Sequence, residues 1–379
     1  MPDGVGGRPS VLMTTDAVGG VWRYTLDLAA GFAARGVGAV LAVLGPAPDV
    51  AQRAEAAGFA LVETGLALDW TAEGPGELAG AARALQGLAA RLGVASVHLH
   101  APALAGSGGW TAPVVAVAHS CVATWWLAVR GGPLPEDFRW RTEAARAGLE
   151  AADAVIAPSA AHAAAVREVY GKVGVQVVHN GSAWPDEPSP SGRGLGEGLA
   201  TLTPPLSRRE RENRGQRERA VLTAGRLWDE GKGAAALDRV APELGAPIRA
   251  AGPVRGPNGA TVELPNLELL GNLDRAALAR AYAGASVFAS MARYEPFGLS
   301  VLEAARAGMR LVLSDIPSFR ELWDRAAIFV RDEAELLPVL REALERDGDG
   351  GARERAQRYT VDAMVEGTLA VHRHVGALV

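Results

Sequence analysis

Short apolar runs alternate with longer segments of helical periodicity along most of this chain. In the first half, the runs lie near residues 10–14, 37–44, 94–100, 113–118, 153–157 and 175–178. The pattern stops after about residue 184 and resumes at AVLTAGR, with runs near 219–224, 246–251, 267–270, 285–289, 310–313 and 327–330. Such alternation is typical of parallel strands joined by crossover helices. The sequence therefore predicts two doubly wound α/β units.

The first predicted helix lies in GVWRYTLDLAAGFAARG. Leu26, Ala29, Ala30 and Ala33 share one stripe at helical spacing, and Gly36 is a typical stop. We expect this stripe to face the core.

The stretch between the two halves has a different composition. Residues 185–218 are rich in Pro, Gly, Ser and Arg and poor in aromatic residues. Such a segment cannot bury enough apolar surface to order itself, so we interpret it as a flexible linker or insertion. With domains of roughly 100 to 200 residues, a chain of 379 residues fits two domains around it.

Charge and cysteine content exclude several classes of protein. The formal net charge of -5 argues against a dedicated nucleic-acid binder, which normally has a basic surface. Cys121 is the only cysteine, so an intramolecular disulfide is excluded and a cysteine zinc site is disfavoured. The first twenty residues lack a secretory pattern, and the most apolar stretch, PVVAVAHSCVATWWLAV, is too interrupted for a membrane span. We expect a cytoplasmic protein.

The most specific stretch is MARYEPFGLSVLEAARAG, which follows an apolar strand and opens a helix near Gly298. The backbone amides of Phe297, Gly298 and Leu299 would form an anion site suited to a phosphate. A carboxylate beside bound phosphates would repel them, so Glu295 and Glu303 more plausibly accept hydrogen bonds from the hydroxyls of a sugar or ribose. The alternative for Glu303, a solvated helix residue, is disfavoured by its apolar neighbours.

A second motif, AGRLWDEGKG, opens the same half. Arg226 ends a strand and Lys232 precedes a helix, so two cations lie at the carboxyl edge of the predicted sheet. They suit a diphosphate, with a pair of surface cations as the alternative. The chain has 36 arginines and only two lysines, which makes Lys232 informative.

The first half offers weaker signals. Gly19 and Gly20 follow the first strand and allow a ligand to approach the backbone closely. Their spacing does not give GxGxxG, which counts against a dinucleotide-dependent dehydrogenase. His119 ends the strand VVAVA at the same edge, where a ligand contact and a structural role are equally consistent.

Residues for an acceptor are the least specific. We consider Asp16 at the end of the first strand, Asn180 in VVHNGSAW, and Trp125 with Trp126, whose rings could stack on a sugar. Packing is the commoner role for such rings. The tryptophans also lie in a segment that mixes aromatic residues with arginines, so a peripheral membrane contact stays open as an alternative.

Together these motifs resemble the retaining family-4 glycosyltransferases of the GT-B fold, glycosyl transferases group 1. The resemblance rests on EPFGLSVLE, GRLWDEGKG, DAVIAPS, HNG and the Gly-Gly loop, and the long linker departs from the pattern. It implies two Rossmann-like domains facing a central cleft. Residues 1–184 would form the acceptor side and 219–358 the donor domain, with a helix in 359–379 crossing back to the N-terminal domain.

The resemblance also implies roles for the charged residues. Arg226 and Lys232 would bind the donor diphosphate, Glu303 the nucleotide ribose and Glu295 the transferred sugar. His119 would contact the sugar near the reacting centre. The remaining donor contacts would come from Gly19, Gly20 and the amides of Phe297, Gly298 and Leu299.

The implied reaction transfers a sugar, with retention, from a nucleotide-diphosphate sugar such as a UDP- or GDP-sugar. The acceptor would be a hydroxyl of a sugar, a lipid-linked or a small molecule, in glycan, polysaccharide or glycoconjugate biosynthesis. Neither a metal nor another cofactor is expected, and no nucleic acid. The alternatives are a nucleotide-sugar epimerase or phosphorylase on a similar frame, and a non-catalytic nucleotide-sugar-binding protein.

Overall fold

A parallel sheet lies at the centre of each of the two units into which the chain divides. Unit 1 comprises Met1–Gly181 with Val361–Val379, and unit 2 comprises Ser182–Thr360. The computed structural model describes residues 9–183, 217–346 and 350–378. Apart from its last two residues, the linker predicted at 185–218 lies outside the described residues.

In the described part of unit 1, a seven-stranded parallel sheet has the order β3-β2-β1-β4-β5-β6-β7. Its strands are β1 (Ser10–Asp16), β2 (Gly38–Leu44), β3 (Ala60–Glu63), β4 (Ser96–Leu99), β5 (Val114–Val117), β6 (Ala154–Ala157) and β7 (Val175–Val177). Six of these confirm the predicted apolar runs. We did not predict β3, because this short edge strand buries no residue completely and so carries little apolar signal.

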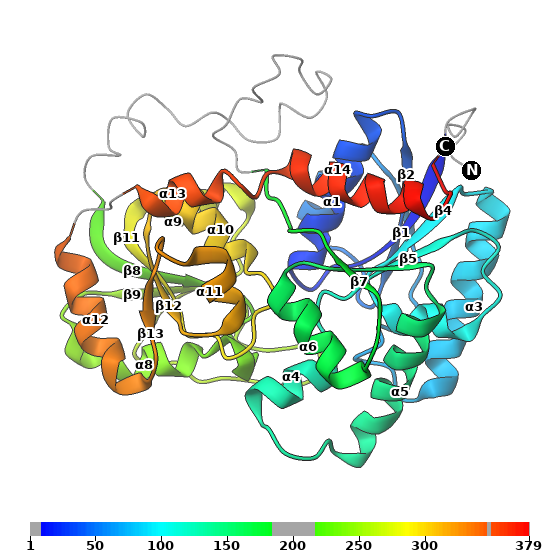
Figure 1. Ribbon diagram of the computed structural model, residues 1–379. Coiled ribbons are helices and arrows are strands. Elements are labelled where there is room, and N and C mark those ends of the chain that lie inside the picture. Colours follow the sequence, from blue (N-terminus) through cyan, green and yellow to red (C-terminus); the bar gives the residue numbers. More distant parts are fainter. Residues whose placement is uncertain (1–8, 184–216, 347–349, 379) are drawn as a thin grey trace. The chain divides into compact units, whose positions relative to one another are not determined.

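Helices cover both faces of this sheet (Figure 1). They are α1 (Gly20–Ala33), α2 (Val50–Glu55), α3 (Pro75–Leu92), η1 (Pro102–Ser107), α4 (Val122–Val129), α5 (Glu136–Ala151), α6 (Ala160–Tyr170) and α14 (Val361–His374). Helices α3, η1, α4, α5 and α6 pack on one face, and α1 with α14 pack on the other. The core is thus a three-layer arrangement of helices, sheet and helices.

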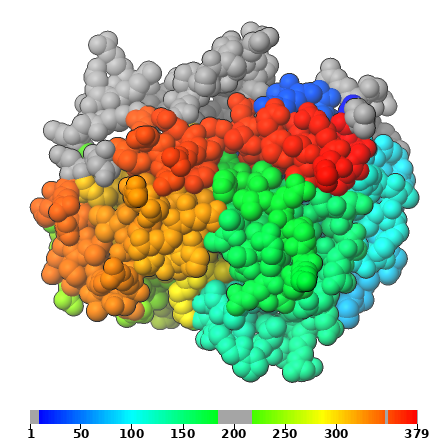
Figure 2. Space-filling model, in the orientation of Figure 1, coloured from blue at the N-terminus to red at the C-terminus, as the bar shows by residue number. Residues whose placement is uncertain are grey.

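Helix α1 is buried on more than the stripe that its periodicity predicted. It ends before Gly36 as expected, but Ala33 is exposed and Ala30 is only half-buried. The reason is α14, which packs along α1 (Figure 1) and lies at the surface of the molecule, as the red residues of Figure 2 show. A Cβ on Gly31 would lie 2.2 Å from the Cγ2 of Val365. The second contact face belongs to a helix distant in sequence, so local periodicity could not reveal it.

In unit 2, the described residues form a six-stranded parallel sheet of order β10-β9-β8-β11-β12-β13. Its strands are β8 (Glu218–Ala224), β9 (Ile248–Ala251), β10 (Glu268–Gly271), β11 (Ala285–Ser290), β12 (Arg310–Ser314) and β13 (Ile328–Val330). Its helices are η3 (Glu230–Lys232), α8 (Ala234–Leu244), α9 (Arg275–Gly284), α10 (Leu299–Arg306), α11 (Pro317–Trp323), α12 (Glu333–Glu345) and α13 (Gly351–Ala356). All six predicted strands are confirmed. Helices α9, α10, α11 and α13 cover one face, and α8 and α12 cover the other.

Strand order reverses at one point in each sheet. In unit 1 the reversal lies between β1 and β4, and in unit 2 between β8 and β11. Doubly wound sheets bind ligands beyond the carboxyl ends of the strands at such points, because the adjoining loops diverge there and leave a crevice. The loops after these four strands are therefore the expected positions of ligand-binding residues.

Helix α5 approaches η1 so closely that only glycine fits at the contact. A Cβ on Gly148 would lie 1.8 Å from the carbonyl oxygen of Pro102. Gly80 in α3 is also helical, but the nearest atom to a Cβ there is the end of the Arg83 side chain, 4.0 Å away.

These two glycines give a matched test of the packing. Gly148→Ala should lower the free energy of unfolding by about 1 to 3 kcal/mol, the usual cost of overpacking. Gly80→Ala should raise it by about 0.5 to 1 kcal/mol, because alanine has the better helix propensity. Urea unfolding of both variants measures the difference, and equal effects would show that α5 and η1 are not in close contact.

Candidate functional site

The predicted donor residues of unit 2 lie at its strand-order reversal. Arg226 and Lys232 follow β8, Glu295 follows β11, and Glu303 lies on α10, the helix after β11. Because β8 and β11 are neighbouring parallel strands, their carboxyl ends lie at one edge of the sheet. The fold thus brings the two sequence motifs to one place.

Backbone contacts join the loops after these two strands. The carbonyl oxygen of Gly231 accepts hydrogen bonds from the amides of Arg293, at 2.8 Å, and Tyr294, at 3.2 Å. Gly233 has φ +68°, and a Cβ there would lie 1.9 Å from the carbonyl oxygen of Met291. Glycine is required at this position by both conformation and space. The Gly231–Gly233 segment therefore holds Lys232 beside the loop that carries Glu295.

Lys232 and Glu295 form an ion pair across this junction. The Lys232 Nζ lies 2.7 Å from Glu295 Oε2, and the two side chains are 19% and 16% exposed. Lys232 is thus mostly buried and paired, unlike a fully exposed surface lysine. The partial exposure leaves both groups within reach of a ligand.

Arg226 is held by residues of its own loop. Its Nη2 lies 3.3 Å from Asp229 Oδ2, and its guanidinium lies 5.6 Å from the centre of the Trp228 ring. Asp229 is buried and also accepts a hydrogen bond from the amide of Gly231 at 2.9 Å. This carboxylate orders the loop and the arginine together. We did not single it out from the sequence, although an Asp side chain commonly accepts a hydrogen bond from the amide two residues on.

Helix α10 begins where the sequence predicted. Its N-cap, Gly298, has φ +88° and supplies no side-chain cap, and the helix starts at Leu299. Ser318 fixes the preceding loop, because its hydroxyl donates to the carbonyl oxygen of Glu295 at 2.5 Å. The first turn of α10 thus lies next to the ion pair, and the positive end of a helix dipole favours anions.

Glu303 is half-buried on α10 and is not simply solvated. The Tyr282 hydroxyl lies 3.3 Å from Glu303 Oε2, and the Ser182 hydroxyl lies 3.5 Å from Oε1. Burial, and secondarily the charge of Glu303, raise the pKa of Tyr282 well above its usual value, so the phenol stays protonated. Tyr282 and Ser182 were missed, because both are distant in sequence from the motif that they support.

In unit 1, several predicted residues lie at the reversal between β1 and β4. Asp16 ends β1 and accepts a hydrogen bond from the amide of Val18 at 2.8 Å. Gly19 is the N-cap of α1 and provides no side-chain cap, and Gly20 is the first residue of the helix. His119 follows β5, the next strand beyond β4, and its Nε2 lies 2.8 Å from His100 Nδ1.

The other acceptor residues lie elsewhere in unit 1. Trp125 and Trp126 are half-buried on α4, and the Trp126 ring packs edge-on against Phe138 with 5.6 Å between centroids. Asn180 is buried beyond β7, two strands from β5. The structure does not bring these residues together, and their acceptor role stays a prediction. Within the described ranges, no helix is long and apolar enough to cross a bilayer.

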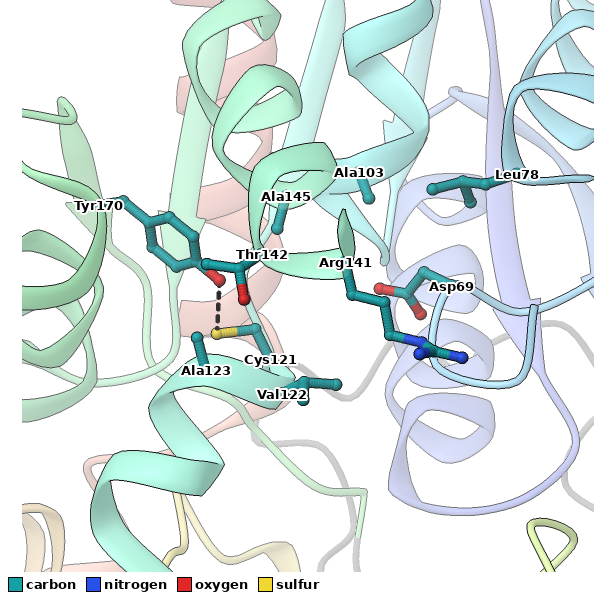
Figure 3. A pocket seen from close by; sticks show the side chains of 10 residues that line it. All are labelled: Asp69, Leu78, Ala103, Cys121, Val122, Ala123, Arg141, Thr142, Ala145 and Tyr170. Carbon is teal, nitrogen blue, oxygen red and sulfur yellow. Dashed lines mark hydrogen bonds between the residues drawn. The ribbon is translucent and has the colours of Figure 1, made fainter. Parts of the chain in front are cut away.

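A small pocket lies beside Cys121 in unit 1 (Figure 3). Its volume is about 20 Å³, room for a single water molecule, so it does not hold a sugar. The Cys121 thiol accepts a hydrogen bond from the Tyr170 hydroxyl at 3.1 Å. Burial raises the pKa of Cys121, so the residue remains a thiol that caps α4 and is not a nucleophile.

Comparison with known protein families gives one match in each unit. The model of the family described as Glycosyltransferase Family 4 matches residues 18–182. The model of the family described as Glycosyl transferases group 1 matches residues 218–346. No curated protein matches the chain.

Solved structures resemble the whole chain at low identity. Sucrose-phosphate synthase from Thermosynechococcus elongatus is 19% identical with a TM-score of 0.72, covering 98% of this chain and 100% of its own. Anabaena HepE in complex with UDP-glucose is 16% identical with a TM-score of 0.69, covering 97% and 100%. WaaG, a glycosyltransferase involved in lipopolysaccharide biosynthesis, is 15% identical with a TM-score of 0.63, covering 96% and 99%.

At these identities the likeness establishes the fold, while the two family matches establish the relationship. The expected doubly wound units are present, each matched by its own family model. The chain therefore belongs to the family-4, group 1 glycosyltransferases and has the GT-B fold.

Proposed function

We propose that this protein is a retaining glycosyltransferase that moves a sugar from a UDP- or GDP-sugar to a hydroxyl acceptor in glycan, polysaccharide or glycoconjugate biosynthesis. The acceptor is a sugar, a lipid-linked molecule or another small molecule that carries a hydroxyl group. The observation that carries the proposal is the Lys232–Glu295 ion pair at the strand-order reversal of unit 2. A cation for phosphate and a carboxylate for sugar hydroxyls are adjacent there.

In this proposal the cations and the first turn of α10 bind the donor diphosphate. Lys232 supplies a compact charge, and Arg226 supplies a planar fork that Asp229 already orients. The amides of Phe297, Gly298 and Leu299 add fixed dipoles. Negative charge grows on the phosphate as the sugar leaves, so these groups stabilise the transition state more than the bound donor.

The two carboxylates bind hydroxyl groups of the donor. Glu295 accepts from the transferred sugar while it stays paired with Lys232, and Glu303 accepts from the ribose. The Tyr282 and Ser182 hydroxyls contact the Glu303 carboxylate and hold it in place. In this proposal His119 contacts the transferred sugar, and Gly19 and Gly20 allow the diphosphate to approach the backbone.

The reaction exchanges one bond at the anomeric carbon. The bond from this carbon to the phosphate oxygen breaks, and a bond to the acceptor oxygen forms on the same face. The acceptor proton passes to the departing phosphate oxygen. The solved structures of HepE with UDP-glucose and with UDP support a nucleotide-sugar donor of this type.

Product analysis tests the function. The protein is incubated with UDP- and GDP-sugars and candidate hydroxyl acceptors, and the anomeric configuration of each product is read by NMR. A thermal-shift screen over UDP, GDP, ADP and dTDP selects the base first, because a ligand at 100 times its Kd stabilises by about 2.7 kcal/mol. Conversion of the donor without transfer would indicate an epimerase, and binding without any turnover would indicate a sensor.

Transfer should not require a metal ion. Among the described residues, no group of three or more His, Cys, Asp or Glu is arranged to hold one. We propose that Arg226, Lys232 and the helix amides neutralise the leaving group instead. Activity should therefore survive EDTA, and complete loss that magnesium or manganese restores would contradict this.

Lys232→Ala should lower turnover by about 100-fold to 1,000-fold, because removing one preorganised charge-stabilising donor costs about 2.7 to 4 kcal/mol. Donor affinity should fall less than turnover, and Lys232→Arg should rescue only partly. The control is Lys172→Ala, which changes the other lysine of the chain, an exposed residue of unit 1. If Lys232→Ala stays within about twofold of the parent in both parameters, the diphosphate binds elsewhere.

The two carboxylates should separate in binding and turnover. Glu303→Gln should weaken UDP or GDP binding by about 10-fold to 100-fold, because a hydrogen bond to a charged group contributes about 1.5 to 3 kcal/mol. Glu295→Gln should reduce turnover on the same scale while nucleotide affinity is kept, because free UDP and GDP carry no sugar. Calorimetry measures nucleotide affinity, and steady-state rates measure turnover. If Glu295→Gln weakens nucleotide binding and Glu303→Gln lowers only turnover, Glu295 binds the ribose and Glu303 the transferred sugar.

A further inference from the structure

Four of the seven histidines of the chain gather beside β4 in unit 1. They are His98, His100, His119 and His372. Burial keeps the pKa of His98 and His100 well below the usual range and lowers the pKa of His119 to about 3 and of His372 to about 4. All four rings are therefore neutral near pH 7, and each has one N–H and one acceptor nitrogen. Which nitrogen carries the proton follows from the hydrogen bonds.

Thr25 fixes the proton on His100. The Thr25 hydroxyl donates to the carbonyl oxygen of Val21 at 2.8 Å, the usual back-bond of a helical threonine. It also lies 3.0 Å from His100 Nε2. A hydroxyl has a single hydrogen, and Val21 already receives it. The His100 Nε2 must therefore be the donor in this contact, and His100 Nδ1 is left as an acceptor.

His100 in turn fixes the proton on His119. The His100 Nδ1 lies 2.8 Å from His119 Nε2, so His119 must donate this hydrogen bond from Nε2. The Nδ1 of a neutral His119 then carries a lone pair. No hydrogen bond within the described residues reaches this Nδ1, and the atom is not one of the buried side-chain nitrogens or oxygens that lack a partner.

The ring orientations are fixed by packing. Tyr24 is buried on α1, and its ring meets His119 edge-on at 4.6 Å and His100 edge-on at 5.2 Å between centroids. The backbone amide of His100 donates to the Thr14 hydroxyl of β1 at 2.9 Å. Neither imidazole can turn over without disturbing these contacts.

We propose that His100 and Thr25 are positioning residues that hold His119 as its Nε2–H tautomer, so that His119 presents an acceptor nitrogen, and not a donor, to a sugar hydroxyl. The role of His119 toward the sugar rests on the proposed function, whereas its tautomer does not. An acceptor here selects for a ligand with a hydroxyl at this point, since a ligand without one leaves the nitrogen unpaired.

The other two histidines form a separate chain. The Ser96 hydroxyl lies 2.9 Å from His372 Nδ1, and His372 Nε2 lies 3.1 Å from His98 Nδ1. Ser96 is a buried hydroxyl hydrogen-bonded to an imidazole, as Thr25 is, but it does not touch His100 or His119. Ser96→Ala is therefore a matched control for Thr25→Val.

The tautomer can be read directly by NMR without donor or acceptor. Long-range proton–nitrogen correlation spectra of histidine-labelled protein distinguish Nε2–H from Nδ1–H imidazoles, and His119→Asn identifies the His119 signals. We expect Nε2–H for His119 in the parent and in Ser96→Ala. Thr25→Val should produce a mixture of tautomers, and Thr25→Ser, which keeps the hydroxyl, should restore the parent spectrum. An Nδ1–H tautomer in the parent would overturn the proposal.

Turnover gives the second readout. Removing the hydrogen-bond partner behind a metal-bound histidine lowers activity by about 10-fold to 100-fold, and we expect His100→Leu and Thr25→Val to act on the same scale here, with little change in the donor KM. His100→Asn should retain more activity than His100→Leu, because its amide oxygen can still accept from His119. Melting temperatures show that each variant is folded.

The outcomes separate the two proposals. If His119 is the Nε2–H tautomer but neither the parent nor any variant has transferase activity, the proposed function is wrong and the tautomer assignment is still supported. If the protein has transferase activity and His100→Leu and Thr25→Val leave it unchanged, the positioning role is wrong and the proposed function is still supported.

Discussion

The contact between Gly233 and the backbone of Met291 is the constraint on which the proposed donor site depends. The two segments approach so closely that a single Cβ would lie 1.9 Å from a carbonyl oxygen, and Gly231 closes the junction by accepting two amides from the opposite loop. Lys232 lies between these two glycines. The backbone therefore places Lys232 beside the loop that carries Glu295, and the long lysine side chain loses rotamer freedom when it pairs with that carboxylate.

This arrangement keeps opposite charges in balance before a donor binds. Lys232 pairs with Glu295 and Arg226 with Asp229, so neither cation is left alone in a partly buried place. An unpaired buried charge is costly, and pairing lowers that cost while the ligand is absent. The carboxylate that neutralises Lys232 is also the one proposed to bind the sugar, which ties recognition of the phosphate to recognition of the sugar.

In unit 1 the comparable constraint is the double burial of α1. The helix is enclosed between the sheet and α14, which buries Tyr24 and Thr25 beside the histidines that follow β4 and β5. Desolvation keeps the His100 and His119 rings neutral. In the proposed arrangement, the hydrogen bonds that run from Val21 through Thr25 and His100 then decide which nitrogen of His119 carries the proton. Helix α14 thus contributes to the environment of His119 through its packing on α1.

Apolar runs alone were sufficient to predict twelve of the strands. Glycines and strand ends were sufficient to predict the loops that carry Arg226, Lys232, Glu295 and His119. These features are local: period, glycine placement and the carboxyl ends of parallel strands follow from neighbouring residues. The exceptions were β3, too short and exposed for a pattern, and the outer face of α1. Only the tertiary structure decided which groups touch, including Lys232 with Glu295, Tyr282 with Glu303 and Thr25 with His100. Such pairings depend on how closely two distant backbones approach, and residue spacing along one chain does not encode that distance.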